Sequence, residues 1–433
     1  MKKILLVSEA FAPDNSIAAI RITKIGKYLA QAGYGVDVLR KGRSGREEDI
    51  LLKNDLKHFN KIFINFNNIF FDFFLKTKRN ILNNNYFNIE NAKNARRIIK
   101  NIKLFNTIKN IFYYLLVDLK SINYYINASL RKDIQFKNYD FVFSSYGPLS
   151  SHLIGAFIKK KNKNIVWIAD FRDPMIFIHV PAVINLYRSF FENFFFKNAD
   201  IITLVSSGCC SAINSKTHII TNGYDKDDFS KIKKISSGNK FIFCYAGTMY
   251  NGYSKADIFF KILNELFENK IIESSEIEIQ YLGRNAKCFI DQVPDYFSKD
   301  IIRNFGFVSR EKSIEIQNKS NALLLLSWNY HNHRGAITGK IFEYLMAKKP
   351  VLCFVSGDIG NCEVKKIISD SESGFCYEEA NSIIDYDLMK NYIKEQIINW
   401  KKWKTGGFIP KKEYVEQYDY KNIVQDLIKL LEK

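Results

Sequence analysis

The stretch KKILLVSEAFAPDNSIAAIRITKIGKYLAQAGYGVDVLRK, residues 2–41, sets a pattern that the rest of the chain repeats. Its first segment, KKILLVSEAF, is an apolar run typical of a buried parallel strand. The turn APDNS follows, with Ser16 as the expected helix cap, and apolar residues then recur at helical spacing up to Gly33. The last segment, YGVDVLRK, predicts another strand. Strand, helix and strand in this order predict a βαβ unit.

The same alternation continues through most of the chain. Further strands are expected at 139–147, 164–174, 199–206 and 217–225, with a helix at 150–161. The polar residues 226–240 are the best linker candidate. Beyond them the pattern predicts strands and helices in alternation, at 241–250, 255–269, 277–283, 313–321, 322–328, 338–349 and 350–356, and a final helix at 418–433. This order predicts an α/β fold with two consecutive doubly wound, Rossmann-like domains.

We therefore predict three parts: an N-terminal domain at 1–228, a C-terminal domain at 229–415, and a C-terminal helix at 416–433 that packs back toward the N-terminal domain. Residues 51–137 interrupt the alternation and look like irregular helices added to the first domain. They hold sixteen Lys and Arg residues against five Asp and Glu, in a chain whose formal net charge is +19. Such a basic and aromatic segment fits an anionic membrane surface, nucleic acid, or the general Lys, Asn and Ile bias of this chain. The fold gives little reason to expect nucleic acid.

Several classes of protein are disfavoured by the composition. The start of the chain lacks the long apolar run of a signal peptide, and no segment approaches the roughly 18 apolar residues of a membrane span. The seven cysteines form no CxxC pair, so we expect reduced thiols. His331 and His333 lack a third ligand at a suitable spacing, so no metal site is expected.

Loops that follow strands are the expected binding positions, because open parallel sheets bind ligands beyond the carboxyl ends of their strands. Several such loops here combine glycine or small residues with a helix start, as in SSYGPLSS and AGTMYNGYSK. Free N–H groups at a helix start suit phosphate oxygens. The first strand is not followed by GxGxxG, and GxxxxGK[ST] is absent, so a simple dinucleotide or P-loop site has little support.

The segment RGAITGKIFEYLMAKKPVL, residues 334–352, carries one acid, Glu343, near the start of a predicted helix. Thr338 or Gly339 is the expected cap. The carboxylate could accept two hydrogen bonds from a vicinal diol such as a ribose, which would leave the loop amides and Lys340 for a diphosphate. Alternatively, Glu343 pairs with Lys340 on a solvated helix face or complements the helix dipole.

These motifs together resemble glycosyltransferase family 4, whose members have the two-domain GT-B fold with a cleft between the domains. The resemblance rests on residues 4–39, on SSYGPLSSHLIGAFIKK and IVWIADFRDP, on ADIITLVSSG and THIITNGYDKDDF, and on FCYAGTMYNG and GKIFEYLMAKKPVL. It covers most of the chain outside roughly 51–137. The order and spacing of the motifs carry more weight than any one of them.

The resemblance implies site residues on both domains. On the donor side, Glu343 would bind the ribose, Gly247 would allow close approach of the diphosphate, and Lys255 would neutralise it, while Thr248 stands where many members have arginine. Arg334 and the loop Gly335–Gly339, with Thr338 and Lys340, would complete the donor site. Many members carry a second acid at the position of Gly335. The glycine pair of the first loop falls near Ser16 and Ile17 in this chain.

On the acceptor side the expected residues are Ser16, Tyr146, Asp170, Arg172 and Asp173. His152 could approach the reacting sugar. An ordinary helix-cap histidine, and an Arg172–Asp173 cluster that fixes the turn, are the structural alternatives.

The expected activity is transfer of a hexose from a nucleotide sugar to a hydroxyl of a glycan or lipid-linked acceptor, in the synthesis of a surface polysaccharide such as O-antigen or capsule. The resemblance implies a retaining reaction without a cofactor or an obligatory metal, at the cytoplasmic face of a membrane. A nucleotide-sugar epimerase on the same fold and a non-catalytic sugar- or lipid-binding scaffold remain alternatives. The loop SEAFAPD replaces the GTRPE-like loop of such epimerases.

Overall fold

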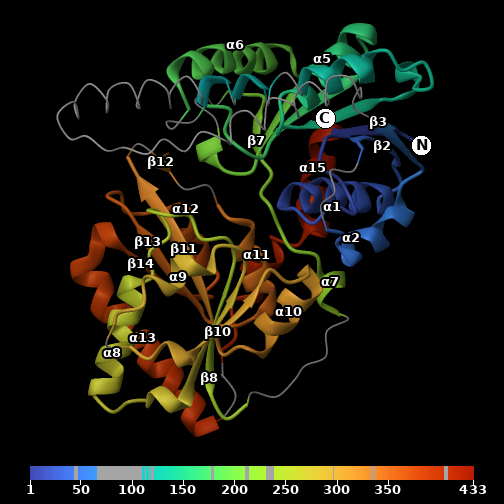
Figure 1. The fold of residues 1–433 in the computed structure, drawn as a ribbon. Helices are drawn as coiled ribbons and strands as arrows, with labels where there is room; N and C mark the ends of the chain where they lie inside the picture. Colours follow the sequence, from blue (N-terminus) through green and yellow to red (C-terminus); the bar gives the residue numbers. More distant parts are fainter. Residues whose placement is uncertain are drawn as a thin grey trace, which may run out of the picture. The chain divides into compact units, whose positions relative to one another are not determined.

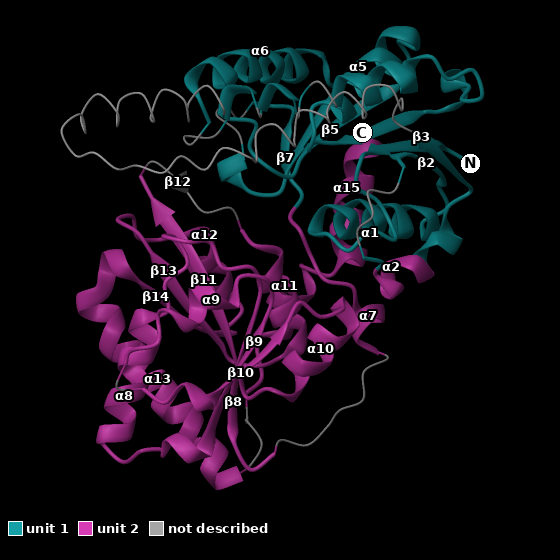
Figure 2. Ribbon diagram, viewed as in Figure 1, with its two compact units in different colours: residues 1–48, 55–220 teal, residues 49–54, 221–433 magenta. Residues whose placement is uncertain are grey.

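The computed structural model describes residues 1–42, 47–65, 110–112, 114–116, 118, 121–176, 180–209, 214–230, 238–295, 297–331, 333–334, 337–403 and 408–433. The chain forms two compact units, shown in different colours in Figure 2. Unit 1 comprises residues 1–48 and 55–220, and unit 2 comprises residues 49–54 and 221–433. Each unit is described by itself.

Unit 1 is built on a parallel sheet of seven strands in the order β3-β2-β1-β4-β5-β6-β7. Each strand pairs in parallel with its neighbours, from Ile4 opposite Val36 on one side of β1 to Ile4 opposite Phe141 on the other. The strand order reverses direction between β1 and β4, as in the doubly wound fold. The strands are β1 (Lys3–Ser8), β2 (Gly35–Lys41), β3 (Lys61–Asn65), β4 (Phe141–Ser145), β5 (Val166–Phe171), β6 (Ile201–Leu204) and β7 (Thr217–Ile219).

Helices cover both faces of this sheet (Figure 1). Helix α1 (Ile17–Gln31) packs on one face, where Gly26 is close to Leu6. On the other face lie α5 (Ser150–Lys161), α6 (Ala182–Asn198) and the helical residues 121–129, and a core cluster there includes Leu5 and Val7. Neighbouring residues of β1 therefore face opposite layers, as the strand pleat requires. The short 3-10 helices are η1 (Leu56–His58), η3 (Phe136–Asn138) and η4 (Ser207–Cys209).

Unit 2 has the same topology. Six parallel strands follow the order β10-β9-β8-β11-β13-β14, and β12 (His333–Arg334) pairs antiparallel with β11. The order again reverses beside the first strand, between β8 and β11. The parallel strands are β8 (Phe241–Ala246), β9 (Ile277–Leu282), β10 (Ile302–Gly306), β11 (Ala322–Tyr330), β13 (Val351–Ser356) and β14 (Gly374–Glu378).

Two hydrophobic clusters enclose the sheet of unit 2. Phe243 belongs to the cluster that contains α8 and α13, whereas the next residue, Cys244, belongs to the cluster that contains α11 and α12. The helices are α2 (Ile50–Asp55), α7 (Lys226–Ser230), α8 (Asp257–Glu268), α9 (Ala286–Ile290), α10 (Arg310–Lys319), α11 (Gly339–Ala347), α12 (Glu363–Asp370), α13 (Ser382–Trp403), α14 (Lys412–Glu416) and α15 (Tyr420–Leu431). The 3-10 helices are η5 (Ser274–Glu276), η6 (Lys299–Ile301) and η7 (Glu379–Asn381).

The predicted doubly wound organisation of both halves is confirmed. Ser16 caps α1 as expected, because its side chain accepts a hydrogen bond from the Ala19 N–H at 3.2 Å. The prediction that 51–137 contains irregular helices is confirmed for α2, η1 and residues 121–129, but it was wrong for residues 61–65, which form the edge strand β3. Residues 66–109 lie outside the described part of the chain. Among the residues described, no helix has both the length and the apolar character that a membrane span requires.

Candidate functional site

The donor-side residues predicted from the sequence follow the two strands at which the strand order of unit 2 reverses. Gly247 directly follows β8, and α11 begins after the β11–β12 hairpin. Thr338 caps α11, because its hydroxyl oxygen accepts a hydrogen bond from the Lys340 N–H at 3.1 Å. Ligands of doubly wound sheets bind at this topological switch point, so the fold places these residues where a nucleotide would be expected.

Glu343 lies just beyond the first turn of α11 and is 7% exposed. Arg310 donates through Nε to Glu343 Oε1 at 3.1 Å, and Lys340 Nζ donates to Oε2 at 3.3 Å. Burial alone would raise the pKa of Glu343, but Lys340 and Arg310 outweigh it and lower the pKa to about 2. The carboxylate is therefore ionised at neutral pH, and each oxygen keeps one lone pair for a further donor.

The Lys340–Glu343 pair matches one of the alternatives left open by the sequence, but the helix face is buried. Arg310 was missed. Its guanidinium, 5% exposed in its side chain, also donates through Nη1 to Asp228 Oδ2 at 2.7 Å and lies 3.9 Å from Asp49 Oδ2. The pKa of Asp49 is raised, mainly by burial, although Arg310 opposes this rise. Arg310 thus holds three buried carboxylates together and fixes the position of Glu343.

The backbone of the loop after β8 lies close to that of the loop after β9, and Gly283 makes this approach possible, whereas the expected role of Gly247 beside a diphosphate stays a prediction. A Cβ on Gly283, whose φ is +152°, would lie 1.8 Å from the carbonyl oxygen of Gly247. A Cβ on Gly247 itself would meet only the Tyr245 ring, at 3.2 Å from its hydroxyl. Thr248 is exposed, and its carbonyl oxygen accepts from the Tyr245 hydroxyl at 3.2 Å. Gly283 is therefore the sterically required residue where these two loops meet.

Lys255 is not a free cation in this structure. Its Nζ lies 3.0 Å from both carboxylate oxygens of Glu379, and Glu379 Oε2 also accepts from the Gly357 N–H at 2.9 Å. The expected neutralisation of a diphosphate by Lys255 therefore competes with this ion pair. Sequence reasoning did not find Glu379, because more than a hundred residues separate it from Lys255.

Other predicted donor residues are only partly described. Arg334 lies in β12, where it is opposite Asn329 of β11, so this position is in a hairpin rather than in the expected loop. Gly335 lies outside the described residues. Gly339 is the first residue of α11 rather than its cap.

Asp170, at the carboxyl end of β5, is fully buried and occupied by protein partners. Arg21 donates to both of its oxygens, at 2.6 and 3.1 Å, and the hydroxyls of Ser145 and Thr203 donate at 2.9 and 2.8 Å. Burial would raise the pKa of Asp170, but Arg21 and the hydroxyls lower it. Asp170 therefore joins α1, β4, β5 and β6, and this arrangement contradicts its expected role in binding an acceptor.

Arg172 fixes the loop after β4, in agreement with the structural alternative. Its Nη2 donates to the carbonyl oxygen of Gly147 at 2.6 Å, and its Nε donates to that of Tyr146. The Tyr146 ring is buried and stacks on Phe171 at 6.0 Å between centroids. Asp173 is the accessible member of the group: its side chain is 56% exposed, and its carboxylate is 3.7 Å from Arg172 Nη1.

His152 does not reach a ligand surface, which contradicts its expected approach to the reacting sugar. The ring has no exposed area, Nδ1 is 2.8 Å from Ser144 Oγ, and Phe171 and Phe195 contact it at centroid distances of 4.6 and 5.1 Å. Burial lowers its pKa to about 3. At neutral pH His152 is an uncharged residue of the aromatic core.

A polar group that the sequence did not suggest lies where the strand order of unit 1 reverses. Glu9 directly follows β1; its Oε1 accepts from the Ser150 hydroxyl at 2.7 Å and its Oε2 from Lys41 Nζ at 3.0 Å. Its side chain is 15% exposed. Ser16, in the same loop, uses its hydroxyl to cap α1. Glu9 therefore places a partly exposed carboxylate at the switch point of unit 1.

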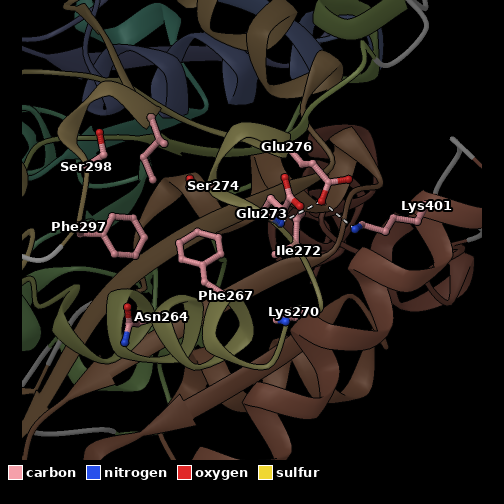
Figure 3. Close-up of a pocket in the computed structure, with 11 residues that line it drawn as sticks. Asn264, Phe267, Lys270, Ile272, Glu273, Ser274, Glu276, Phe297, Ser298 and Lys401 are labelled. Atoms are coloured by element: carbon pink, nitrogen blue, oxygen red, sulfur yellow. Dashed lines mark hydrogen bonds and ion pairs between the residues drawn. The ribbon is translucent and has the colours of Figure 1, made fainter.

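An open surface pocket of about 910 Å³ lies elsewhere in unit 2 (Figure 3). Ser274 and Ile301, which line it, come just before β9 and β10, so it adjoins the amino ends of these strands. Glu276 and Lys401 form an ion pair of 2.7 Å at its rim. The pocket lies at the amino ends of the strands, whereas Gly247 and Thr338 lie beyond the carboxyl ends, so it does not belong to the predicted donor site.

Several known structures match this chain over 100% of its length, among them the following three. The N-terminal domain of trehalose-6-phosphate phosphatase from Candida albicans is 10% identical, is covered to 96% and has a TM-score of 0.59. A mutant of TarM from S. aureus, solved with fondaparinux, α-GlcNAc-glycerol and UDP, is 12% identical, is covered to 100% and has a TM-score of 0.53. A putative UDP-N-acetylglucosamine 2-epimerase from Listeria monocytogenes is 8% identical, is covered to 96% and has a TM-score of 0.52.

This is the GT-B fold. Two Rossmann-like domains with the same strand order account for the likeness over the whole chain. No protein-family model matches the sequence, and a search of curated proteins finds no match to it. At identities of 8–12% the likeness concerns the fold.

Proposed function

We propose that the protein is a glycosyltransferase that moves a hexose from a nucleotide sugar to a hydroxyl of a glycan or lipid-linked acceptor. The observation that carries this proposal is Glu343, a buried, ionised carboxylate in the helix that follows a switch-point strand. A carboxylate held in place by Arg310 and Lys340 is preorganised to accept the two hydroxyls of a ribose. The amides of the loop after β8 and at the start of α11 suit a diphosphate.

In this reaction negative charge grows on the leaving diphosphate while the sugar becomes oxocarbenium-like, as in glycoside hydrolysis. Fixed donors near the diphosphate lower the barrier because they stabilise that charge without reorganisation. In this proposal Lys340, at the first turn of α11, has this role, and Lys255 joins it when its pair with Glu379 opens. On the acceptor side, Glu9 and Asp173, whose side chains are 15% and 56% exposed, take the place of the buried Asp170 and His152 in the proposal.

The finer expectations remain part of the proposal: a retaining reaction by front-face attack, no obligatory metal, and a place in the synthesis of a surface polysaccharide. They are supported by the resemblance of the motifs to glycosyltransferase family 4. The likeness to TarM, solved with UDP and α-GlcNAc-glycerol, is consistent with a nucleotide-sugar donor.

An epimerase is the second candidate, because a putative UDP-N-acetylglucosamine 2-epimerase has nearly the same TM-score as TarM. A panel of nucleotide sugars, first screened by thermal shift, identifies the donor because bound ligand raises the apparent stability. The selected donor is then incubated with and without acceptor alcohols. Release of nucleoside diphosphate that requires an acceptor supports the transferase, whereas conversion of the sugar without any acceptor identifies an epimerase. A chain that neither binds nor converts any donor contradicts both.

A further inference from the structure

The outer surface of unit 1 carries apolar residues where a water-exposed helix would carry charge. Every residue of α6 is described, and the large apolar side chains on its exposed face are Val183, Leu186, Phe190 and Phe194, which are 54%, 74%, 68% and 39% exposed. These positions recur at helical spacing and form one stripe. Lys197 is the single charged residue among the exposed positions of α6.

A second stripe lies on the described residues between 110 and 130, most of which are helical. Its exposed members, within the described part of this segment, are Phe112, Leu115, Ile122, Ile126 and Leu130, and they are between 36% and 71% exposed. Its described charged residue is Asp118, which is buried and pairs with Arg188 of α6 at 3.3 Å. The guanidinium of Arg188 also lies 5.3 Å from the centre of the Tyr114 ring. These contacts join the two helices, so their exposed stripes belong to one surface layer.

Helix α5 continues this layer and adds positive charge. It packs against α6, and its Phe157 ring is 6.2 Å from that of Tyr125. Helix α5 contains no acidic residue, and Lys160 and Lys161 near its end are exposed. The only acid of α6, Glu192, is buried. The exposed charges on α5 and α6 are therefore all positive.

We infer that this layer, formed by α5, α6 and the described helical residues between 110 and 129, is a docking surface for an anionic lipid bilayer. Apolar side chains on an amphipathic helix enter the boundary between headgroups and acyl chains, while lysines attract anionic lipid. A second copy of the chain fits less well, because pairing this layer with itself would bring its lysines together without an exposed acid on α5 or α6 to neutralise them. This inference does not depend on the proposed reaction, since it rests only on the exposed apolar side chains and the exposed lysines of the layer.

The test is sedimentation of the full chain with phosphatidylcholine vesicles, prepared with and without phosphatidylglycerol. The double variant Leu186→Ser/Phe190→Ser removes two of the most exposed side chains of the layer. The matched control, Ile383→Ser/Ile384→Ser, changes two side chains that are 94% and 67% exposed on α13 of unit 2. Exposed substitutions should leave folding intact, which the thermal unfolding curve of each variant checks.

The expected result is binding that requires phosphatidylglycerol, falls on the order of 30-fold in the α6 variant and is retained in the α13 control. A tryptophan introduced by Phe190→Trp should add fluorescence that brominated acyl chains quench. The inference is overturned if the wild-type chain does not bind anionic vesicles or if the α6 variant binds them as well as the wild type. It is also overturned if brominated acyl chains do not quench the fluorescence of the introduced tryptophan. Light scattering that shows a dimer dissociated by the α6 substitutions, without vesicle binding, would assign the surface to a second copy instead.

Discussion

Replacing Arg310 with methionine should destabilise unit 2 by about 3–5 kcal/mol at neutral pH. The reason is the set of carboxylates that share this guanidinium. Asp228 and Glu343 accept from it at 2.7 and 3.1 Å, and the side chain of each of these two acids is at most 9% exposed. Methionine fills similar space but leaves the buried carboxylates without the guanidinium, while Lys340 still pairs with Glu343. Removing one partner of a buried ion pair lowers stability by this amount because the remaining charge stays buried and is not hydrated.

The pH dependence separates this electrostatic effect from lost packing. In the folded chain the pKa of Glu343 is about 2, below its ordinary value of 4.5. The ionised form therefore contributes stability that is present above about pH 4.5 and is lost as the pH falls toward 2. Arg310→Met loses part of this contribution. The difference in unfolding free energy between wild type and variant should accordingly be largest near pH 7 and should narrow below pH 4.5.

The assay is amide hydrogen exchange of peptides from α11, measured by mass spectrometry along a urea series, because it reports on unit 2 even if the two units unfold separately. Arg303→Met, at an exposed position of β10, is the matched control and should change the unfolding free energy by less than about 0.5 kcal/mol. Arg310→Lys should fall between the two, since lysine keeps the charge but lacks the planar fork. A loss below about 1 kcal/mol, or one that stays constant as the pH falls from 7 to about 3, would refute the reasoning.

Three further outcomes are expected. The pKa of His152 is about 3 in the folded chain, against an ordinary 6.5, so the unfolded chain takes up a proton at higher pH than the folded chain. The free energy of unfolding should therefore fall by about 1.4 kcal/mol between pH 8 and pH 5.5. His152→Gln should make the free energy of unfolding less dependent on pH in this range, and an unchanged dependence would contradict the assignment of His152 as a buried neutral residue. Asp170→Ala should lower the free energy of unfolding of unit 1, measured by hydrogen exchange, by about 3–5 kcal/mol, because the buried Arg21 loses its carboxylate partner. A near-neutral effect would show that Asp170 does not stabilise the fold. Lys255→Ala should reduce turnover at least ten-fold whereas Glu379→Gln, which frees that lysine, should not; equal losses would mean that the pair is only structural.

The strands that sequence analysis located are those with continuous apolar runs. In β8 and β11 nearly every residue is buried, and this burial is visible as an unbroken hydrophobic segment. The edge strands β3 and β10 were missed because most of their residues are exposed or half-buried, so their composition resembles a loop. Helix α13 was missed as well, since its 22 residues show little separation of polar and apolar faces.

Local features of the site could be predicted, and distant partners could not. The Thr338 cap and the Lys340–Glu343 pair involve residues within five positions of each other, so helical geometry alone brings them together. The grouping of Arg310 with Asp228 depends on how α7 and α10 pack, and no periodicity in the sequence records it. For His152 the same limit applies. A histidine near a helix start looks accessible in the sequence, and only the packing of aromatic side chains around it shows that it is not.

Calorimetric titration of the wild-type chain and of Glu343→Gln with nucleoside diphosphate sugars tests most directly whether unit 2 is the donor site. We expect at least one nucleotide to bind the wild-type chain and to bind Glu343→Gln at least ten-fold more weakly, since a hydrogen bond to a charged group contributes about 1.5–3 kcal/mol. Glu311→Gln, at an exposed position on the first turn of α10, is the matched control and should bind like the wild type. Equal affinity in Glu343→Gln and the wild type, or no nucleotide binding at all, would contradict the account.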